Sequence, residues 1–132
     1  MQKPREIAAR ILQLRSSGAD YTENLLDAEL VTANLSAPDR RLCQELVYGV
    51  VRQQAALDWL IDRKIAAGRR QKEVLKILLR LGLYQIFWLD RIPAHAAVNE
   101  TVEMTKRAGF NTQAGFVNAI LRAYLREADA TR

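Results

Sequence analysis

A run of apolar residues between Val74 and Leu89 limits what this chain can fold into more than any other feature. Because Arg80, Gly82 and Gln85 interrupt it, and because it is shorter than the roughly 20 residues that a bilayer requires, a membrane span is not expected. A helix that is apolar on every side then belongs inside a protein. We therefore predict that residues 72–89 contain the central, buried helix of a soluble bundle. The apolar members are Val74, Leu75, Ile77, Leu78, Leu79, Leu81, Leu83, Ile86, Phe87, Trp88 and Leu89.

The rest of the sequence predicts amphipathic helices packed around this one. Apolar residues recur at helical spacing, and no stretch shows the period-two alternation of a strand. Gly18 and Gly109 are expected to end helices, and Ser36 is expected to cap one. The chain is therefore predicted to be all-α, with six to eight helices. Besides the central helix, the expected ranges are 4–16, 22–34, 36–51, 54–65, 93–108 and 111–127.

Length and composition favour an ordinary globular domain. The 132 residues are 49% apolar and 27% charged, which suits one domain over residues 1–132 with disordered ends at about 1–3 and 128–132. The single cysteine, Cys43, cannot form an internal disulfide and is expected to be a buried, inert thiol. Since no apolar signal core follows Met1, the expected location is the cytoplasm.

Positive charge is concentrated in two segments. The net charge is +5, and residues 63–80 alone carry seven basic side chains against Glu73. Clustered Lys and Arg suit phosphate groups, so a nucleic acid is the expected partner; the alternative is a solvated surface with ordinary ion pairs. No exposed helix-turn-helix pair stands out for DNA, which favours RNA. The predicted RNA-binding residues are Lys3, Arg5, Arg10, Arg69, Arg70, Lys72 and Lys76.

Few residues could carry catalysis. His95 is the only histidine, and the sequence offers neither a metal-ligand cluster nor a glycine-rich phosphate loop. We therefore predict that this chain has no catalytic residues, no metal site and no cofactor of its own. Four polar residues at helical positions are instead expected to form a structural hydrogen-bonding network: His95, Asn99, Glu100 and Asn118. Direct RNA contact by the asparagines, and base stacking or pH sensing by His95, are the alternatives.

Three large aromatic residues allow two interpretations. Tyr48, Trp59 and Trp88 all lie at helical spacing with aliphatic residues, which predicts that they pack in the core. The alternative is that they are exposed anchors of a helical domain that docks onto another protein.

Several segments together resemble the NusB-like domain family, and they span nearly the whole chain in the expected order. They are 39–52, Leu-Arg-Leu-Gly-Leu-Tyr-Gln at 79–85, Arg-Ile-Pro-Ala-His-Ala-Ala-Val-Asn-Glu at 91–100, and Phe-Val-Asn-Ala-Ile-Leu-Arg at 116–122. The family has two branches: the antitermination factor NusB, which binds RNA with a ribosomal protein, and the N-terminal domain of the bacterial small-subunit rRNA cytosine-C5 methyltransferases (RsmB, also Sun or Fmu). Tyr84, Gln85, residues 93–96 and Arg122 are more similar to the methyltransferase branch.

The resemblance implies an all-helical fold of two small subdomains that binds RNA, with Arg5 and Arg10 in places comparable to the arginine-rich segment of NusB. It further implies an RNA-binding module, not catalytic alone, for an rRNA methyltransferase. S-adenosylmethionine is then expected only in a separate catalytic domain. The expected partners are rRNA and an adjoining methyltransferase domain or a ribosomal protein, with no membrane. A free-standing NusB-type antitermination factor and a helical protein-docking domain are the alternatives.

Overall fold

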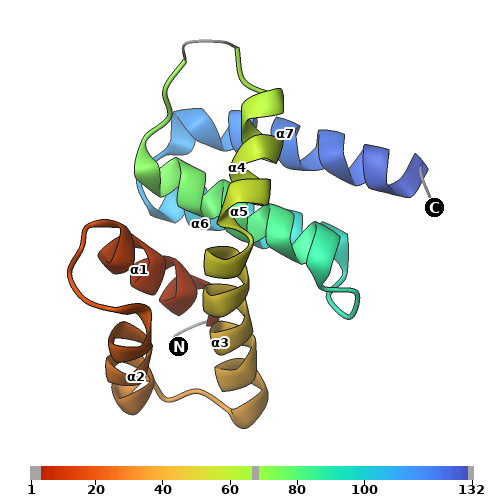
Figure 1. Cartoon of the computed structure of the whole chain (residues 1–132). Helices are drawn as coiled ribbons and strands as arrows, with labels where there is room; N and C mark the ends of the chain where they lie inside the picture. Colours follow the sequence, from red (N-terminus) through yellow and green to blue (C-terminus); the bar gives the residue numbers. More distant parts are fainter. Residues whose placement is uncertain (1–3, 67–68, 131–132) are drawn as a thin grey trace. The chain divides into compact units, whose positions relative to one another are not determined.

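The computed structural model describes residues 4–66 and 69–130, which form seven helices and no strand (Figure 1). This confirms the all-α prediction and the expected number of helices. The predicted ranges are also close, because periodicity and helix-ending residues are local signals. The helices are α1 (Pro4–Ser16), α2 (Thr22–Thr32), α3 (Ala37–Arg52), α4 (Gln54–Arg63), α5 (Glu73–Trp88), α6 (Ala94–Arg107) and α7 (Asn111–Ala130).

The chain divides into two compact units, one ending at Arg52 and the other beginning at Gln53. In the first unit, α1 packs against both α2 and α3. Ile7, Ile11 and Leu46 are completely buried between these helices. The first unit therefore has an apolar core of its own, which is what the amphipathic spacing of its helices predicts.

In the second unit, α5 is the central helix and contacts α4, α6 and α7 (Figure 1). Residues 77–86 are all buried, which is more than two full turns without a solvent-facing side. α6 and α7 also pack against each other. The expected central buried helix is confirmed, and it is the core element of this unit.

Two glycines end helices as predicted. Gly18 and Gly109 have φ angles of +81° and +92°, in the left-handed region that glycine adopts without strain. After Gly109, the N–H of Phe110 donates to the Thr105 carbonyl at 3.1 Å, the bond that closes a Schellman motif. At the start of α3, the Ser36 hydroxyl accepts a hydrogen bond from the N–H of Asp39 at 3.3 Å, so the predicted cap is present.

α5 and α7 approach each other closely at Gly82. A Cβ atom added at this position would lie 2.9 Å from both methyl carbons of Leu121 and 3.3 Å from the Thr101 hydroxyl. Leu121 is completely buried and has little room to move aside. Only a glycine therefore permits this helix spacing without repacking.

The structure corrects the prediction that three aromatic residues pack in the core. Trp59, Tyr48 and Trp88 are 60%, 39% and 38% exposed, respectively. Trp59 lies two residues from both Leu57 and Ile61, which are the buried residues of α4, so it projects from the opposite face. Tyr48 lies between the buried Val47 and Gly49 on α3 and is only partly exposed, and Trp88 is the last residue of α5.

α7 continues to Ala130, three residues beyond its predicted end at 127. Disorder at the two ends of the chain stays a prediction. Residues 1–3, 131 and 132, which the same prediction covers, lie outside the described residues.

The close approach at Gly82 predicts opposite effects for two glycine-to-alanine substitutions. Gly82→Ala should lower the unfolding free energy by about 1–2 kcal/mol, because overpacking against Leu121 exceeds the gain in helix propensity. Gly115→Ala, on α7 with nothing within 4 Å of the added carbon, should raise it by up to about 1 kcal/mol. Urea unfolding measures both, and a similar increase for the two variants would contradict the packing.

The buried thiol of Cys43 should be unreactive in the folded chain. Burial, together with the nearby charge of Glu29, raises its pKa from 9.0 to about 11. At pH 8 its reaction with a disulfide reagent should be at least about 100-fold slower than in the urea-unfolded chain. The stabilisation gained from keeping this thiol neutral is fully present below pH 9.0 and is lost as the pH rises towards 11. Labelling at the unfolded rate would show that Cys43 is accessible.

Candidate nucleic-acid interface

The loop before α5 and the first turn of α5 form a cation-lined pocket in the second unit. Its volume is about 270 Å³. Arg69 and Arg70 on its rim are exposed, and Lys76, one turn into α5, is half-buried. Three of the predicted RNA-binding residues are therefore brought together in one place. The lining residues are Ile61, Asp62, Ile65, Arg69, Arg70, Gln71 and Lys76.

Local structure explains how these cations converge. The apolar side of the pocket comes from Ile61 in the last turn of α4 and from Ile65, two residues after the helix ends. The N–H of Ile65 donates to the Asp62 carbonyl at 3.3 Å. Farther along, the N–H of Arg69 donates to the Ala66 carbonyl at 3.1 Å. The chain then enters α5, whose amino end carries partial positive charge and adds to the attraction for an anion.

The fourth predicted residue of this segment, Lys72, lies outside the pocket. Its exposed ammonium group sits 5.5 Å from the ring centre of Phe110, which precedes α7. A cation at this distance is attracted by the ring but keeps its remaining hydrogen-bond donors. Lys72 therefore extends the positive surface of the second unit from the α5 end towards the α6–α7 turn.

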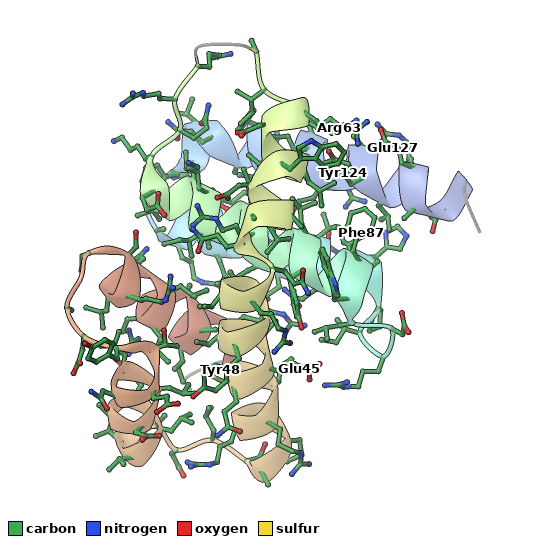
Figure 2. The ribbon with its side chains drawn as sticks, in the orientation of Figure 1. Glu45, Tyr48, Arg63, Phe87, Tyr124 and Glu127 are labelled. Atoms are coloured by element: carbon green, nitrogen blue, oxygen red, sulfur yellow. The ribbon has the colours of Figure 1, made fainter. Side chains whose placement is uncertain are left out.

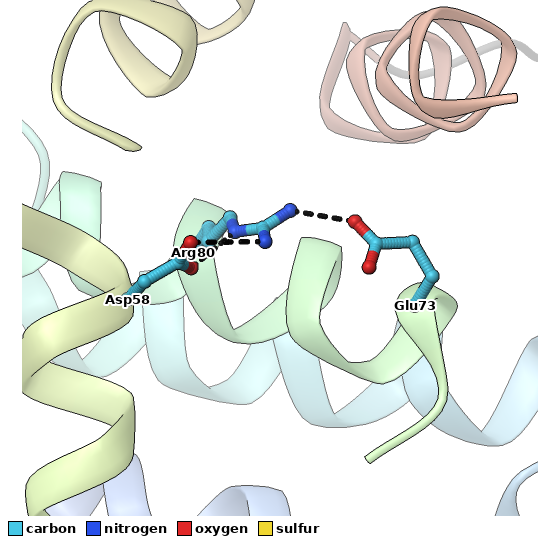
Figure 3. A network of polar contacts seen from close by, with 3 residues as sticks. All are labelled: Asp58, Glu73 and Arg80. Carbon is cyan, nitrogen blue, oxygen red and sulfur yellow. Dashed lines mark hydrogen bonds and ion pairs between the residues drawn. The ribbon is translucent and has the colours of Figure 1, made fainter. Parts of the chain in front are cut away.

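Arg80 is basic but does not belong to the surface (Figure 3). It is 5% exposed, and its guanidinium group donates to Asp58 on α4 at 2.7 and 3.3 Å and to Glu73 on α5 at 2.9 Å. Burial disfavours the charged form, but the bonds to both carboxylates outweigh it and raise the pKa of Arg80. Its role is to join α4 to α5.

The N-terminal cluster is in the first unit. Arg10 is exposed and pairs with Glu29 of α2 at 3.0 Å, whereas Arg5 is half-buried in α1. Lys3 lies outside the described residues. An exposed ion pair of this kind contributes little to stability, so Arg10 can exchange its carboxylate partner for a phosphate at small cost. These three residues remain predicted RNA contacts.

The polar network centres on a residue that the site prediction did not include. Arg122 on α7 donates to the side-chain oxygens of Asn99 on α6, at 3.1 Å, and Asn118 on α7, at 3.0 Å. Glu100 accepts a hydrogen bond from Arg107 at 2.9 Å. His95 is solvent-exposed in the first turn of α6 and takes no part in these hydrogen bonds. The four-residue spacing of Asn118 and Arg122 was the available sequence signal.

A second pocket, of about 430 Å³, has the opposite character. Its only charged lining residue is acidic, so it does not suit an anion. It lies where α5 turns into α6 and is lined by Ile86, Leu89, Asp90, Ile92, Pro93 and Ala94.

Two further features bear on the predicted chemistry. Within residues 4–66 and 69–130, His, Cys, Asp and Glu side chains form no group of three placed to hold a metal ion. None of the described helices has the length and apolar content that a bilayer crossing requires.

The helical fold and its cation-lined pocket are those of a protein that can bind a polyanion. Comparison with known proteins makes the class specific. The chain belongs to the NusB family, whose sequence model matches residues 2–126.

Several relatives of this chain are described as ribosomal RNA small subunit methyltransferases. A probable ribosomal RNA small subunit methyltransferase B from Synechocystis sp. is 43% identical over 130 residues, covering 96% of this chain. The Bacillus subtilis protein of the same description is 37% identical over 123 residues, covering 93% of the chain. The chain spans only about 28% of the length of these relatives.

A solved structure agrees with the fold. The structure of T. maritima NusB superimposes with a TM-score of 0.84 at 24% identity, covering 94% of this chain and 89% of that one. At this identity the likeness establishes the shared NusB fold.

The buried position of Arg80 predicts that its loss is costly. Arg80→Met should lower the unfolding free energy by about 2–3 kcal/mol, because Asp58 and Glu73 lose the cation that compensates them. The same replacement at Arg126, an exposed arginine of α7, should change it by less than about 0.5 kcal/mol. Equal urea midpoints for the two variants would contradict a structural role for Arg80.

Proposed function

We propose that this chain is an RNA-binding module and that it forms the N-terminal substrate-binding domain of a small-subunit rRNA 5-methylcytosine methyltransferase. The pocket that gathers Arg69, Arg70 and Lys76 is the observation that carries the RNA-binding part. Three cations within one pocket can contact neighbouring phosphates of one strand. The methyltransferase part is supported by relatives that are 37–43% identical to the chain.

On this proposal the module is not catalytic alone. Its one cysteine, Cys43, is completely buried and cannot reach a base. S-adenosylmethionine and the reacting cysteine chemistry would belong to another part of the methyltransferase, while this module holds structured rRNA in place. Such a protein would work in the cytoplasm, where the small ribosomal subunit is assembled.

Two other functions compete with this proposal. A free-standing NusB-type antitermination factor would bind RNA together with a ribosomal protein. The methyltransferase relatives reach 43% identity, whereas T. maritima NusB reaches 24%, which favours the methyltransferase branch. A helical docking domain for another protein would have negligible RNA affinity at physiological salt.

Removal of the pocket cations should weaken RNA binding and reduce its salt dependence. The combined variant Arg69→Ala, Arg70→Ala, Lys76→Ala should bind a labelled hairpin of small-subunit rRNA at least about tenfold more weakly. The slope of log affinity against log salt should fall by about 2–3, since each phosphate contact releases roughly one counterion. Fluorescence anisotropy over a range of salt concentrations measures both quantities.

A matched control removes the same charge elsewhere. Arg41→Ala, Arg52→Ala, Arg126→Ala replaces three exposed arginines outside both predicted clusters, so it should retain most of the affinity and slope. The separate variant Arg5→Ala, Arg10→Ala tests the N-terminal cluster. If the pocket variant behaves like the control, the pocket is not the RNA site; if the parent chain binds no RNA, the proposed function is wrong. A stable complex with a ribosomal protein would favour antitermination.

A further inference from the structure

Trp59 is the most exposed tryptophan of the chain and lies on the outward face of α4. Its ring is 60% exposed, although burial of so large an apolar surface would be favourable. The guanidinium carbon of Arg63, one turn later, lies 4.8 Å from the ring centre. A cation held against an aromatic ring in this way limits the motion of both groups. Trp59 therefore presents an exposed aromatic ring whose position Arg63 helps to fix.

The residue after Arg63 is also a cation that lies over an aromatic ring, but this second ring is buried. Lys64 lies 4.8 Å from the ring centre of Tyr124 on α7 and also pairs with Glu127. Burial raises the pKa of Tyr124, and its hydroxyl donates to the Leu60 carbonyl at 2.6 Å, which fixes α7 to α4. Figure 2 shows Arg63, Tyr124 and Glu127 gathered on this side of the second unit.

α4 connects this surface to the cation-lined pocket. Ile61 and Asp62 of α4 line the pocket, while Trp59 and Arg63 are exposed residues of the same helix. Asp62 and Trp59 are three residues apart, so they are neighbours on the helix surface, about one turn or 5 Å apart along its axis. One RNA strand can therefore reach both places.

We infer that Trp59, with Arg63 beside it, is a stacking platform for an unpaired base of single-stranded RNA whose phosphates bind at the Arg69, Arg70 and Lys76 pocket. This inference rests on the proposed function and adds to it the recognition of an unpaired segment. An exposed aromatic ring next to a cationic groove is the combination that binds single strands without requiring a particular base. Arg63 adds a positive charge directly beside the ring, which is complementary to the phosphates of an RNA strand.

Intrinsic fluorescence tests this directly, because Trp59 and Trp88 are the only tryptophans. In Trp88→Phe, all tryptophan emission comes from Trp59, and a single-stranded oligoadenylate of about 12 nucleotides should quench it at saturation. In Trp59→Phe, emission comes from Trp88, which stacks on Tyr84 with ring centres 5.6 Å apart, and quenching should be much smaller. A fully paired RNA duplex of equal length should leave the emission of Trp59 nearly unchanged.

Binding affinity gives an independent measurement. Trp59→Leu should weaken binding of the oligoadenylate about tenfold by anisotropy, with the salt slope unchanged, because stacking releases no counterions. Trp59→Phe should restore much of the loss, since phenylalanine also stacks. The large exposure of Trp59 keeps all these variants folded, which circular dichroism and thermal unfolding verify.

The outcomes separate this inference from the proposed function. If the pocket variant loses RNA affinity while Trp59→Leu binds like the parent and Trp59 emission does not change, the RNA site stands and the stacking platform is overturned. If the parent binds no RNA at all, both are overturned. If Trp59→Leu instead abolishes a protein complex or self-association, seen by sedimentation, with RNA binding intact, Trp59 is a protein contact and the inference is wrong.

Discussion

The burial of α5 on every side determines what the other helices of the second unit must supply. Residues 77–86 have no face towards solvent, so each polar group among them needs a partner within the protein. The Gln85 amide donates to the Leu81 carbonyl at 3.0 Å, and Arg80 takes its carboxylates from α4 and from the start of α5. Gly82 contributes by lacking a side chain, which lets α7 close over the helix. Among the residues that the structure describes, every buried side-chain nitrogen and oxygen has a hydrogen-bond partner.

The basic residues of the second unit have two different roles, depending on whether a carboxylate neutralises them. The guanidinium group of Arg80 is neutralised inside the protein, and Lys64 pairs with Glu127 on the surface. Arg69, Arg70 and Lys76 instead surround an open pocket that contains a single carboxylate, Asp62. The local charge available to an anionic ligand is therefore smaller than a count along residues 63–80 indicates, but it is concentrated at one place. Concentration in space is what phosphate recognition requires.

The sequence could predict the helices and the central position of α5, because these depend on local signals. The spacing of apolar residues defines each helix, and Gly18, Gly109 and Ser36 mark helix ends through their own backbone or side chain. The sequence could not predict features that depend on which helices pack together. Trp59 is as apolar as its buried neighbours, and only the packing of α4 through Leu57 and Ile61 shows that it faces outward. Arg122 joins Asn99 on another helix, and no local pattern reveals that contact. The pocket likewise depends on α4 and the loop before α5 lying side by side.

The spacing of residues along α4 sets the positions of three features of the second unit. Ten residues long, α4 contributes Asp58 to the interior ion pair, Ile61 to the pocket and Trp59 to the outer surface. Each residue inserted into a helix rotates everything beyond it by about 100°, so one insertion would misdirect several of these contacts at once. The segment between α4 and α5 has no helical register, but Arg69, Arg70 and Gln71 within it line the pocket, so a change in its length would move them as well. The length of α4 should therefore be kept wherever the interior ion pair, the pocket and the outward tryptophan are all kept.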